Sequence, residues 1–159
     1  MHDLATTFEP GHLERRFYLY PGGLWAEPFA GVITTVLGSC VSVCLWDPQT
    51  GRGGINHFVL PVGGSMLSPR YGNHSLPLLL DKVLGLGNKR ENLLAAVFGG
   101  ASVLAVNLNI PRLGTRNAEV ALDFLHREGI AIIRQDVGGS MGRKLTFRTA
   151  DGSTLVRKL

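Results

Sequence analysis

The chain has 159 residues, of which 45% are hydrophobic and 18% charged, and its formal net charge is +4 at pH 7. This length and apolar content predict one compact domain with a hydrophobic core rather than a disordered polypeptide. No apolar run approaches the roughly 18 residues of a membrane span, and the first residues do not form a basic segment followed by an apolar run. We therefore expect a soluble, cytoplasmic protein without membrane insertion.

The first third of the chain is predicted to be mostly β-structure. Short apolar runs rich in β-branched and aromatic residues, with the period of two typical of strands, cover residues 17–20, 32–36, 41–46 and 55–60. Residues 1–16 precede the first of these runs and are expected to form a loosely ordered extension, which leaves one domain over residues 17–159.

Two of these strands are predicted to form a β-hairpin. The segment Asp47-Pro48-Gln49-Thr50-Gly51 places proline and glycine where a turn favours them. If the turn centres between Pro48 and Gln49, Cys40 and His57 lie directly opposite each other, with Cβ atoms about 4.5–5.5 Å apart. A bulge at Gly51 would shift this register by one residue.

The rest of the chain is predicted to alternate between helices and strands. Leucines at helical spacing indicate a helix from about Ser75 to the stop signal Leu86-Gly87-Asn88, and a second amphipathic pattern covers residues 116–128. Strands are expected at residues 92–98, 130–135, 144–149 and 154–158. The Gly99-Gly100 and Gly138-Gly139 pairs are expected to be turns. This order predicts an α+β fold, a layered α/β sandwich of mixed and antiparallel sheets with two main helices.

Cys40 and His57 are the strongest candidates for chemistry. A thiol attacks well as a thiolate, and a nearby imidazole can take its proton. The chain has two cysteines, but residues four apart along a strand are separated by about 13 Å, which excludes a Cys40–Cys44 disulfide or chelate. Cys44 is therefore interpreted as a core residue. A zinc site of Cys40, His57 and His74 and a cysteine protease or transglutaminase-like acyl transferase remain as alternatives, although we expect no metal or cofactor.

Several sequence blocks around this pair resemble one known family. The blocks are Thr34, Leu37-Gly38-Ser39-Cys40-Val41, Trp46-Asp47, Gly53-Gly54-Ile55-Asn56-His57, Phe98-Gly99-Gly100-Ala101, Gly114-Thr115-Arg116-Asn117, Asp136-Val137-Gly138-Gly139 and Gly142-Arg143. In this order they resemble CheD, the chemoreceptor glutamine deamidases of bacterial chemotaxis. The resemblance implies the layered fold that CheD shares with deamidase domains of certain bacterial toxins. It also implies hydrolysis of glutamine side chains to glutamate on methyl-accepting chemoreceptors.

The resemblance also implies roles for individual residues. Cys40 would form a thioester with the substrate, His57 would act first as acid and then as base, and Thr34 would orient His57, with Thr35 as its nearest competitor. The backbone N–H of Cys40, with that of Gly38 or Ser39, would bind the oxyanion. Further candidates for the substrate groove are Tyr71, Arg116, Asn117 and Arg143.

Partners follow from the resemblance and from the charge. Residues 1–60 carry three Lys or Arg against five Asp or Glu, whereas residues 61–159 carry thirteen against seven. A basic surface suits the helices of a chemoreceptor, which we expect to be the substrate. The protein itself is expected to be a monomer. The same thioester could also form from a glutamate methyl ester. The scattered basic residues and the lack of a known motif do not indicate nucleic-acid binding. The alternative function is a non-catalytic regulator that binds a CheC-type response-regulator phosphatase.

Overall fold

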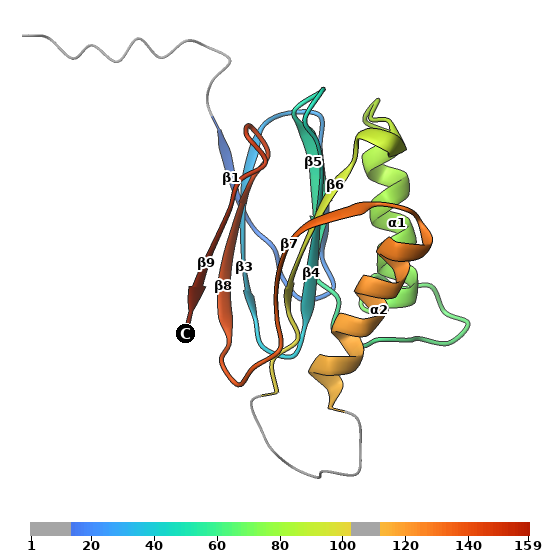
Figure 1. Cartoon of the computed structure of the whole chain (residues 1–159), viewed down its shortest axis with the longest axis vertical. Coiled ribbons are helices and arrows are strands. Elements are labelled where there is room, and N and C mark those ends of the chain that lie inside the picture. Colours follow the sequence, from blue (N-terminus) through green and yellow to red (C-terminus); the bar gives the residue numbers. More distant parts are fainter. Residues whose placement is uncertain (1–13, 103–111) are drawn as a thin grey trace, which may run out of the picture.

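The computed structural model describes residues 14–102 and 112–159. Figure 1 shows three layers, in which two β-sheets face each other and two helices cover the outer face of one sheet. This arrangement confirms the predicted α+β sandwich. None of the helices in the two described ranges is long and apolar enough to span a bilayer.

The first sheet has four strands in the order β1-β3-β8-β9. These strands are β1 (Arg15–Tyr18), β3 (Gly31–Leu37), β8 (Arg143–Arg148) and β9 (Thr154–Lys158). β1 runs parallel to β3, and the other neighbours are antiparallel. Because Arg15 already pairs with Gly31, the domain begins before residue 17, inside the segment expected to be an extension. The expectation for residues 1–13 lies outside the described residues.

The second sheet has five strands in the order β2-β5-β4-β6-β7, with only β6 and β7 parallel to each other. Its strands are β2 (Leu24–Ala26), β5 (Arg52–Asn56), β4 (Val41–Asp47), β6 (Leu94–Gly99) and β7 (Ala131–Val137). The helices that cover this sheet are α1 (Gly72–Leu84) and α2 (Leu113–Arg127), and a short 3₁₀ helix, η1 (Arg90–Asn92), precedes β6. The expected helices are thus present, each beginning three residues earlier than predicted.

β4 lies in the middle of the molecule and separates two hydrophobic cores. Val41, Val43 and Leu45 pack toward the helices, whereas Cys44 packs into the core between the sheets. Because side chains alternate along a strand, Cys40 is on the inter-sheet side, where it packs against that second core.

The β4–β5 register differs from the prediction. Cys44 pairs with Ile55, and Asp47 pairs with Arg52, so the turn contains four residues rather than two. Gly51 closes this turn with φ +68° and donates its N–H to Asp47 O. The predicted direct opposition of Cys40 and His57 is therefore wrong. Ser42 takes the position opposite His57, and Cys40 lies diagonally from the histidine on the same face.

Candidate active site

The imidazole of His57 is oriented by Thr35 on the facing sheet. Thr35 Oγ1 lies 2.6 Å from the carbonyl oxygen of Leu19 and 2.7 Å from His57 Nδ1. A carbonyl only accepts, so the single hydroxyl proton of Thr35 is donated to Leu19 O. The hydroxyl oxygen must then accept from Nδ1–H. In this tautomer the lone pair is on Nε2, which is buried and has no hydrogen-bond partner among the described residues.

His57 is 1% exposed, and its burial controls its charge. Loss of hydration lowers the pKa of the imidazole to about 4, although the backbone of Leu19 acts in the opposite direction. At neutral pH the ring is therefore uncharged, with a proton on Nδ1 and a free lone pair on Nε2. A neutral histidine of this tautomer is suited to accept a proton at Nε2.

The assignment of Thr34 as the orienting residue is corrected by these contacts. Alternation along β3 turns Thr35 into the space between the sheets and Thr34 to the opposite side. Thr35 is fully buried, whereas Thr34 Oγ1 lies 3.4 Å from Thr146 Oγ1 on β8. The residue named as the nearest competitor is thus the one that contacts His57.

Cys40 is half-buried at the start of β4. Burial raises the pKa of its thiol, while its own backbone N–H and the charge of Arg70 act to lower that pKa. The free protein therefore holds a neutral thiol and a neutral imidazole rather than an ion pair. Cys40 Sγ does not hydrogen-bond His57 Nε2 in this structure. Catalytic hydrogen bonds often tighten only when substrate binds.

The turn before Cys40 is held by its carbonyl groups. Gly38 O accepts from Ala101 N, and Cys40 O accepts from Gly100 N, both at 2.9 Å. Within the described ranges, the N–H groups of Gly38 and Ser39 have no acceptor. Backbone N–H groups left open in a fixed turn are the donors that an oxyanion requires.

Asn117, a groove candidate from the sequence, instead supports this turn. Its side chain comes from the second turn of α2 and is fully buried. Nδ2 donates to Ser39 O and to Val59 O, each at 2.9 Å. Asn117 thus ties α2 to the residue before Cys40 and to the segment that follows His57.

The other three groove candidates lie in different environments. Arg143 is 1% exposed and donates to the carbonyls of Gly99, Gly138 and Met141 as well as to Asp136. A side chain enclosed in this way does not line a groove, so that expectation is wrong. Tyr71 is half-buried with its ring edge-on to His74, and Arg116 is exposed on α2.

Two parts of the site were missed from the sequence. One is the carbonyl of Leu19, a backbone group for which the sequence holds no signal. The other is Arg70, the charged residue whose field acts on Cys40. The available signal was its position immediately before Tyr71, the residue that caps the start of α1.

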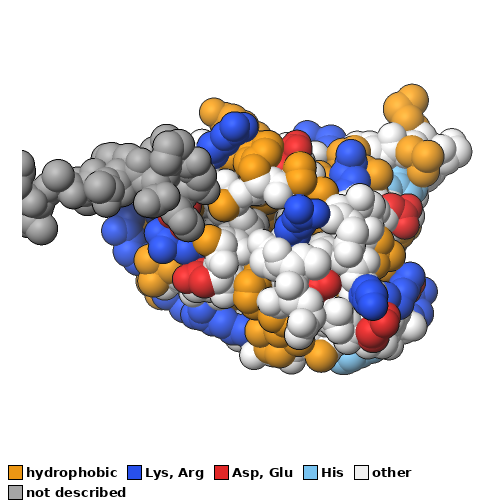
Figure 2. All heavy atoms as spheres, turned by 90° about the horizontal axis from the view of Figure 1, so that it is seen from above, with side chains coloured by type: hydrophobic (Ala, Val, Ile, Leu, Met, Phe, Trp, Pro, Cys, Tyr) orange, Lys and Arg blue, Asp and Glu red, His pale blue; other side chains and the backbone are white. Residues whose placement is uncertain are grey.

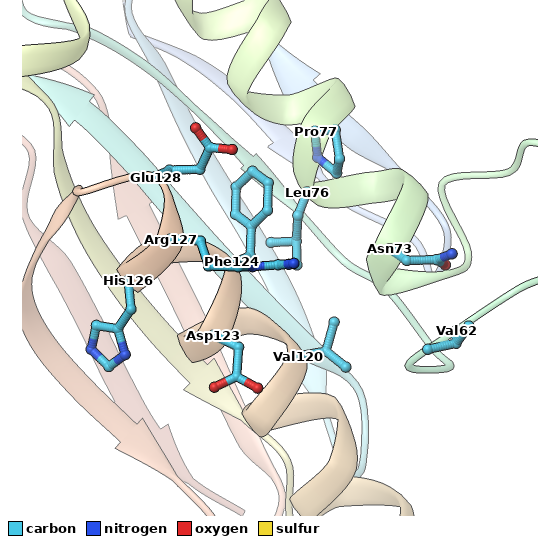
Figure 3. A pocket seen from close by; sticks show the side chains of 10 residues that line it. All are labelled: Val62, Asn73, Leu76, Pro77, Val120, Asp123, Phe124, His126, Arg127 and Glu128. Carbon is cyan, nitrogen blue, oxygen red and sulfur yellow. The ribbon is translucent and has the colours of Figure 1, made fainter.

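A separate groove lies between the two helices, on the side of the second sheet away from His57. Figure 3 shows its lining, with the apolar side chains of Leu76, Phe124 and Val120 flanked by charged groups of α2. Because sheet residues separate this groove from Cys40 and His57, it is not part of the site. Among the described residues, no three His, Cys, Asp or Glu side chains gather as a metal ion would require.

The fold and the site together define a three-layer β/β/α protein with an oriented, neutral histidine near a half-buried cysteine. The chain belongs to the CheD family: the family profile, described as CheD chemotactic sensory transduction, matches residues 61–158.

Relatives extend this match toward the N-terminus. The chain is 42% identical over 144 residues to a protein of Trichlorobacter lovleyi named probable chemoreceptor glutamine deamidase CheD, with 89% of each chain covered. It is 45% identical over 145 residues to probable chemoreceptor glutamine deamidase CheD 1 of Anaeromyxobacter dehalogenans, covering 89% of this chain and 84% of the relative. An alignment over 89% of this chain necessarily includes Cys40 and His57.

Proposed function

We propose that this protein is a cytoplasmic chemoreceptor glutamine deamidase that hydrolyses glutamine side chains through a thioester on Cys40. The observation that carries the proposal is the tautomer of His57: Thr35 fixes the proton on Nδ1 and leaves Nε2 free to act as a base. The names of the relatives supply the substrate class. This activity would regulate adaptation in chemotaxis.

In the first half-reaction, the thiol proton of Cys40 passes to His57 Nε2 and the sulfur attacks the amide carbon. The carbonyl oxygen of the substrate becomes an oxyanion. The Nε2–H then protonates the leaving nitrogen, the C–N bond breaks, and ammonia departs. The products are the thioester and a neutral His57.

In the second half-reaction, His57 Nε2 takes a proton from water, whose oxygen attacks the thioester carbon. The C–S bond breaks as the tetrahedral intermediate collapses, and the thiolate recovers the proton from His57. The free acid that results is a glutamate side chain. A glutamate methyl ester could form the same thioester, with methanol as the leaving group instead of ammonia.

Electrostatic support for the intermediate would come from the turn before Cys40. The N–H groups of Gly38 and Ser39, which are open among the described residues, directly precede the nucleophile, and the N–H of Cys40 acts to lower the pKa of its own thiol. Removing one such donor in an enzyme of this kind costs about 10²–10³ in kcat.

The test is to incubate the protein with a chemoreceptor cytoplasmic fragment and follow the conversion of Gln to Glu by mass spectrometry of the peptides. Adding hydroxylamine should divert part of the product to a glutamyl hydroxamate, because hydroxylamine attacks a thioester. Cys40→Ala should abolish conversion, and His57→Gln should lower it by about 10²–10⁴. Conversion that persists in Cys40→Ala would overturn the mechanism.

The alternative function, regulation of a CheC-type phosphatase, predicts a different pattern. Binding to such a partner would depend on surface residues and would survive Cys40→Ala. A protein that binds the phosphatase but leaves receptor glutamines unchanged would support the alternative and contradict the deamidase. Size-exclusion chromatography with light scattering would test the expected monomer in the same preparation.

A further inference from the structure

Arg70 is attached through its backbone to the segment that lies beside Cys40. Its carbonyl oxygen accepts the N–H groups of Val59 and Leu60, at 2.8 and 3.1 Å. Phe58 pairs with Val41, so Val59 is the next residue outward and lies across from Cys40. The main chain of Arg70 is therefore fixed next to the strand position that faces the nucleophile.

The side chain of Arg70 begins over the backbone that holds His57. Gly22 donates its N–H to His57 O at 2.8 Å and has φ +83°. A Cβ atom at Gly22 would lie only 2.9 Å from Arg70 Cγ, so the aliphatic stem crosses directly over this glycine. Arg70 is thus held between the backbone beside His57 and the segment across from Cys40.

The charge of Arg70 acts on the Cys40 thiol. Among the described residues, no carboxylate forms a salt bridge with its guanidinium. Its field lowers the pKa of the Cys40 thiol, against the larger effect of burial, and it is the charged side chain that acts on this thiol. His57 is neutral and adds no positive charge before it accepts the proton.

We propose that Arg70 is the cation that stabilises the Cys40 thiolate as the thiol proton moves to His57. The inference rests on the proposed function, in which Cys40 acts as the nucleophile. The effect of Arg70 on Cys40 can nevertheless be measured without a receptor. A half-buried thiolate is less well hydrated than a thiolate in water, and a nearby fixed cation offsets part of that deficit. The effect grows when a bound substrate excludes more water.

The test measures alkylation of Cys40 with neutral iodoacetamide and anionic iodoacetate, located by peptide mass spectrometry. We expect Arg70→Gln to shift the pH dependence with iodoacetamide to higher pH and to lower the rate near neutral pH about three- to tenfold. In Arg70→Gln the alkylation rate with iodoacetate should fall more than the rate with iodoacetamide, because the cation also attracts the anionic reagent. Arg70→Lys should recover most of both rates.

The matched control is Arg157→Gln, which removes an exposed arginine from β9 in the other sheet. Its alkylation rates should equal those of the unmodified protein. Equal rates in Arg70→Gln and Arg157→Gln would overturn the inference. Thermal unfolding of each variant shows whether a change in rate comes from lost structure.

Receptor deamidation adds a second readout. If Arg70 acts on the thiolate, Arg70→Gln should lower kcat with little change in KM. A raised KM with unchanged alkylation would instead assign Arg70 to substrate binding and overturn the proposal. A protein that shows the alkylation effect but converts no glutamine would contradict the deamidase function while leaving the Arg70–Cys40 coupling intact.

Discussion

The hydroxyl of Thr35 joins the carbonyl of Leu19 to Nδ1 of His57, with contacts of 2.6 and 2.7 Å. Thr35→Val keeps the shape of the side chain but removes the hydroxyl that fixes the histidine tautomer. We expect this variant to fold and to lose about 10- to 100-fold in kcat for glutamine conversion, because a misoriented base transfers protons less efficiently. Steady-state kinetics with a receptor fragment measure the loss.

Thr34→Val is the matched control for this prediction. Thr34 is the adjacent threonine on β3, and its hydroxyl contacts Thr146 rather than the histidine. Its variant should retain near-normal kcat, and Thr35→Ser should recover most of the activity because it restores a hydroxyl. The opposite order, with Thr34→Val inactive and Thr35→Val active, would show that the hydrogen bond seen here does not operate in catalysis.

The buried imidazole of His57 should make the folded protein sensitive to mild acid. Its pKa is lowered from 6.5 to about 4, so between these values the unfolded chain binds a proton that the folded chain does not. The free energy of unfolding therefore falls as pH decreases from about 7 toward 4, by up to about 3 kcal/mol. Urea unfolding curves collected at intervals of pH measure this slope.

Variants at two histidines separate this effect from general acid sensitivity. His57→Gln removes the buried titrating group, so its stability should depend less on pH over the same interval. His126→Gln changes an exposed histidine on α2 and should keep the full slope. If both variants retain the same slope as the unmodified protein, another group controls the response to acid.

The elements were largely predictable because their patterns are local. Alternating apolar residues and leucines at helical spacing placed the strands and helices within a few residues. β2, with only Leu24–Ala26, was missed because three residues are too few to show a period. The start of α1 was placed too late because Gly72 and Asn73 are weak helix formers, although Gly72 packs closely against Phe58.

The candidate site was predictable in its principal residues but not in its geometry. Cys40 and His57 followed from motif and spacing, but their diagonal relation depends on the number of residues in the turn that ends at Gly51. The choice between Thr34 and Thr35 depends on which residues of β3 face inward, and two adjacent threonines look alike in the sequence. Arg70 is brought near Cys40 by long-range contacts that have no sequence signal, including its backbone bonds to residues 59 and 60.

The distribution of charge on the surface could not be predicted from the sequence either. The excess of basic residues in the second part of the chain does not gather into one patch on the face seen in Figure 2, where Lys and Arg lie among acidic and apolar groups. A count along the sequence therefore does not locate the surface that would meet an acidic partner. The placement of one cation, Arg70, bears more directly on the proposed chemistry.

Arg143 should contribute more to stability than any surface charge near it. Its guanidinium is buried and holds the carbonyls of Gly99 and Gly138 together with Asp136. Arg143→Met removes these buried hydrogen bonds together with the charge that pairs with Asp136, and we expect the free energy of unfolding to fall by about 3 kcal/mol. Chemical denaturation at neutral pH measures the change.

Lys158→Met tests whether the ion pair alone explains that loss. Lys158 Nζ contacts the same Asp136 carboxylate at 3.4 Å, but its side chain is 50% exposed. Its removal should cost less than about 1 kcal/mol. Similar losses in the two variants would mean that the backbone hydrogen bonds of Arg143 add little.

Gly99 offers a way to move the nucleophile without changing it. The residue has φ +108°, and a Cβ atom there would lie 2.2 Å from the carbonyl oxygen of Cys40. Gly139 also has a positive φ, +73°, but a Cβ atom there would meet nothing within 4 Å. Alanine at either position carries a backbone penalty of about 1–2 kcal/mol, but only Gly99→Ala also collides with Cys40.

We therefore expect Gly139→Ala to lose some stability and keep its kcat for glutamine conversion. Gly99→Ala should displace the turn at Cys40 and lower kcat by about 100-fold, because a shift of about 1 Å in a catalytic group has an effect of this size. Kinetics at a temperature where both variants are folded, checked by circular dichroism, separate the two effects. Equal kcat values would show that the position of the Cys40 carbonyl does not set the reactivity of its thiol.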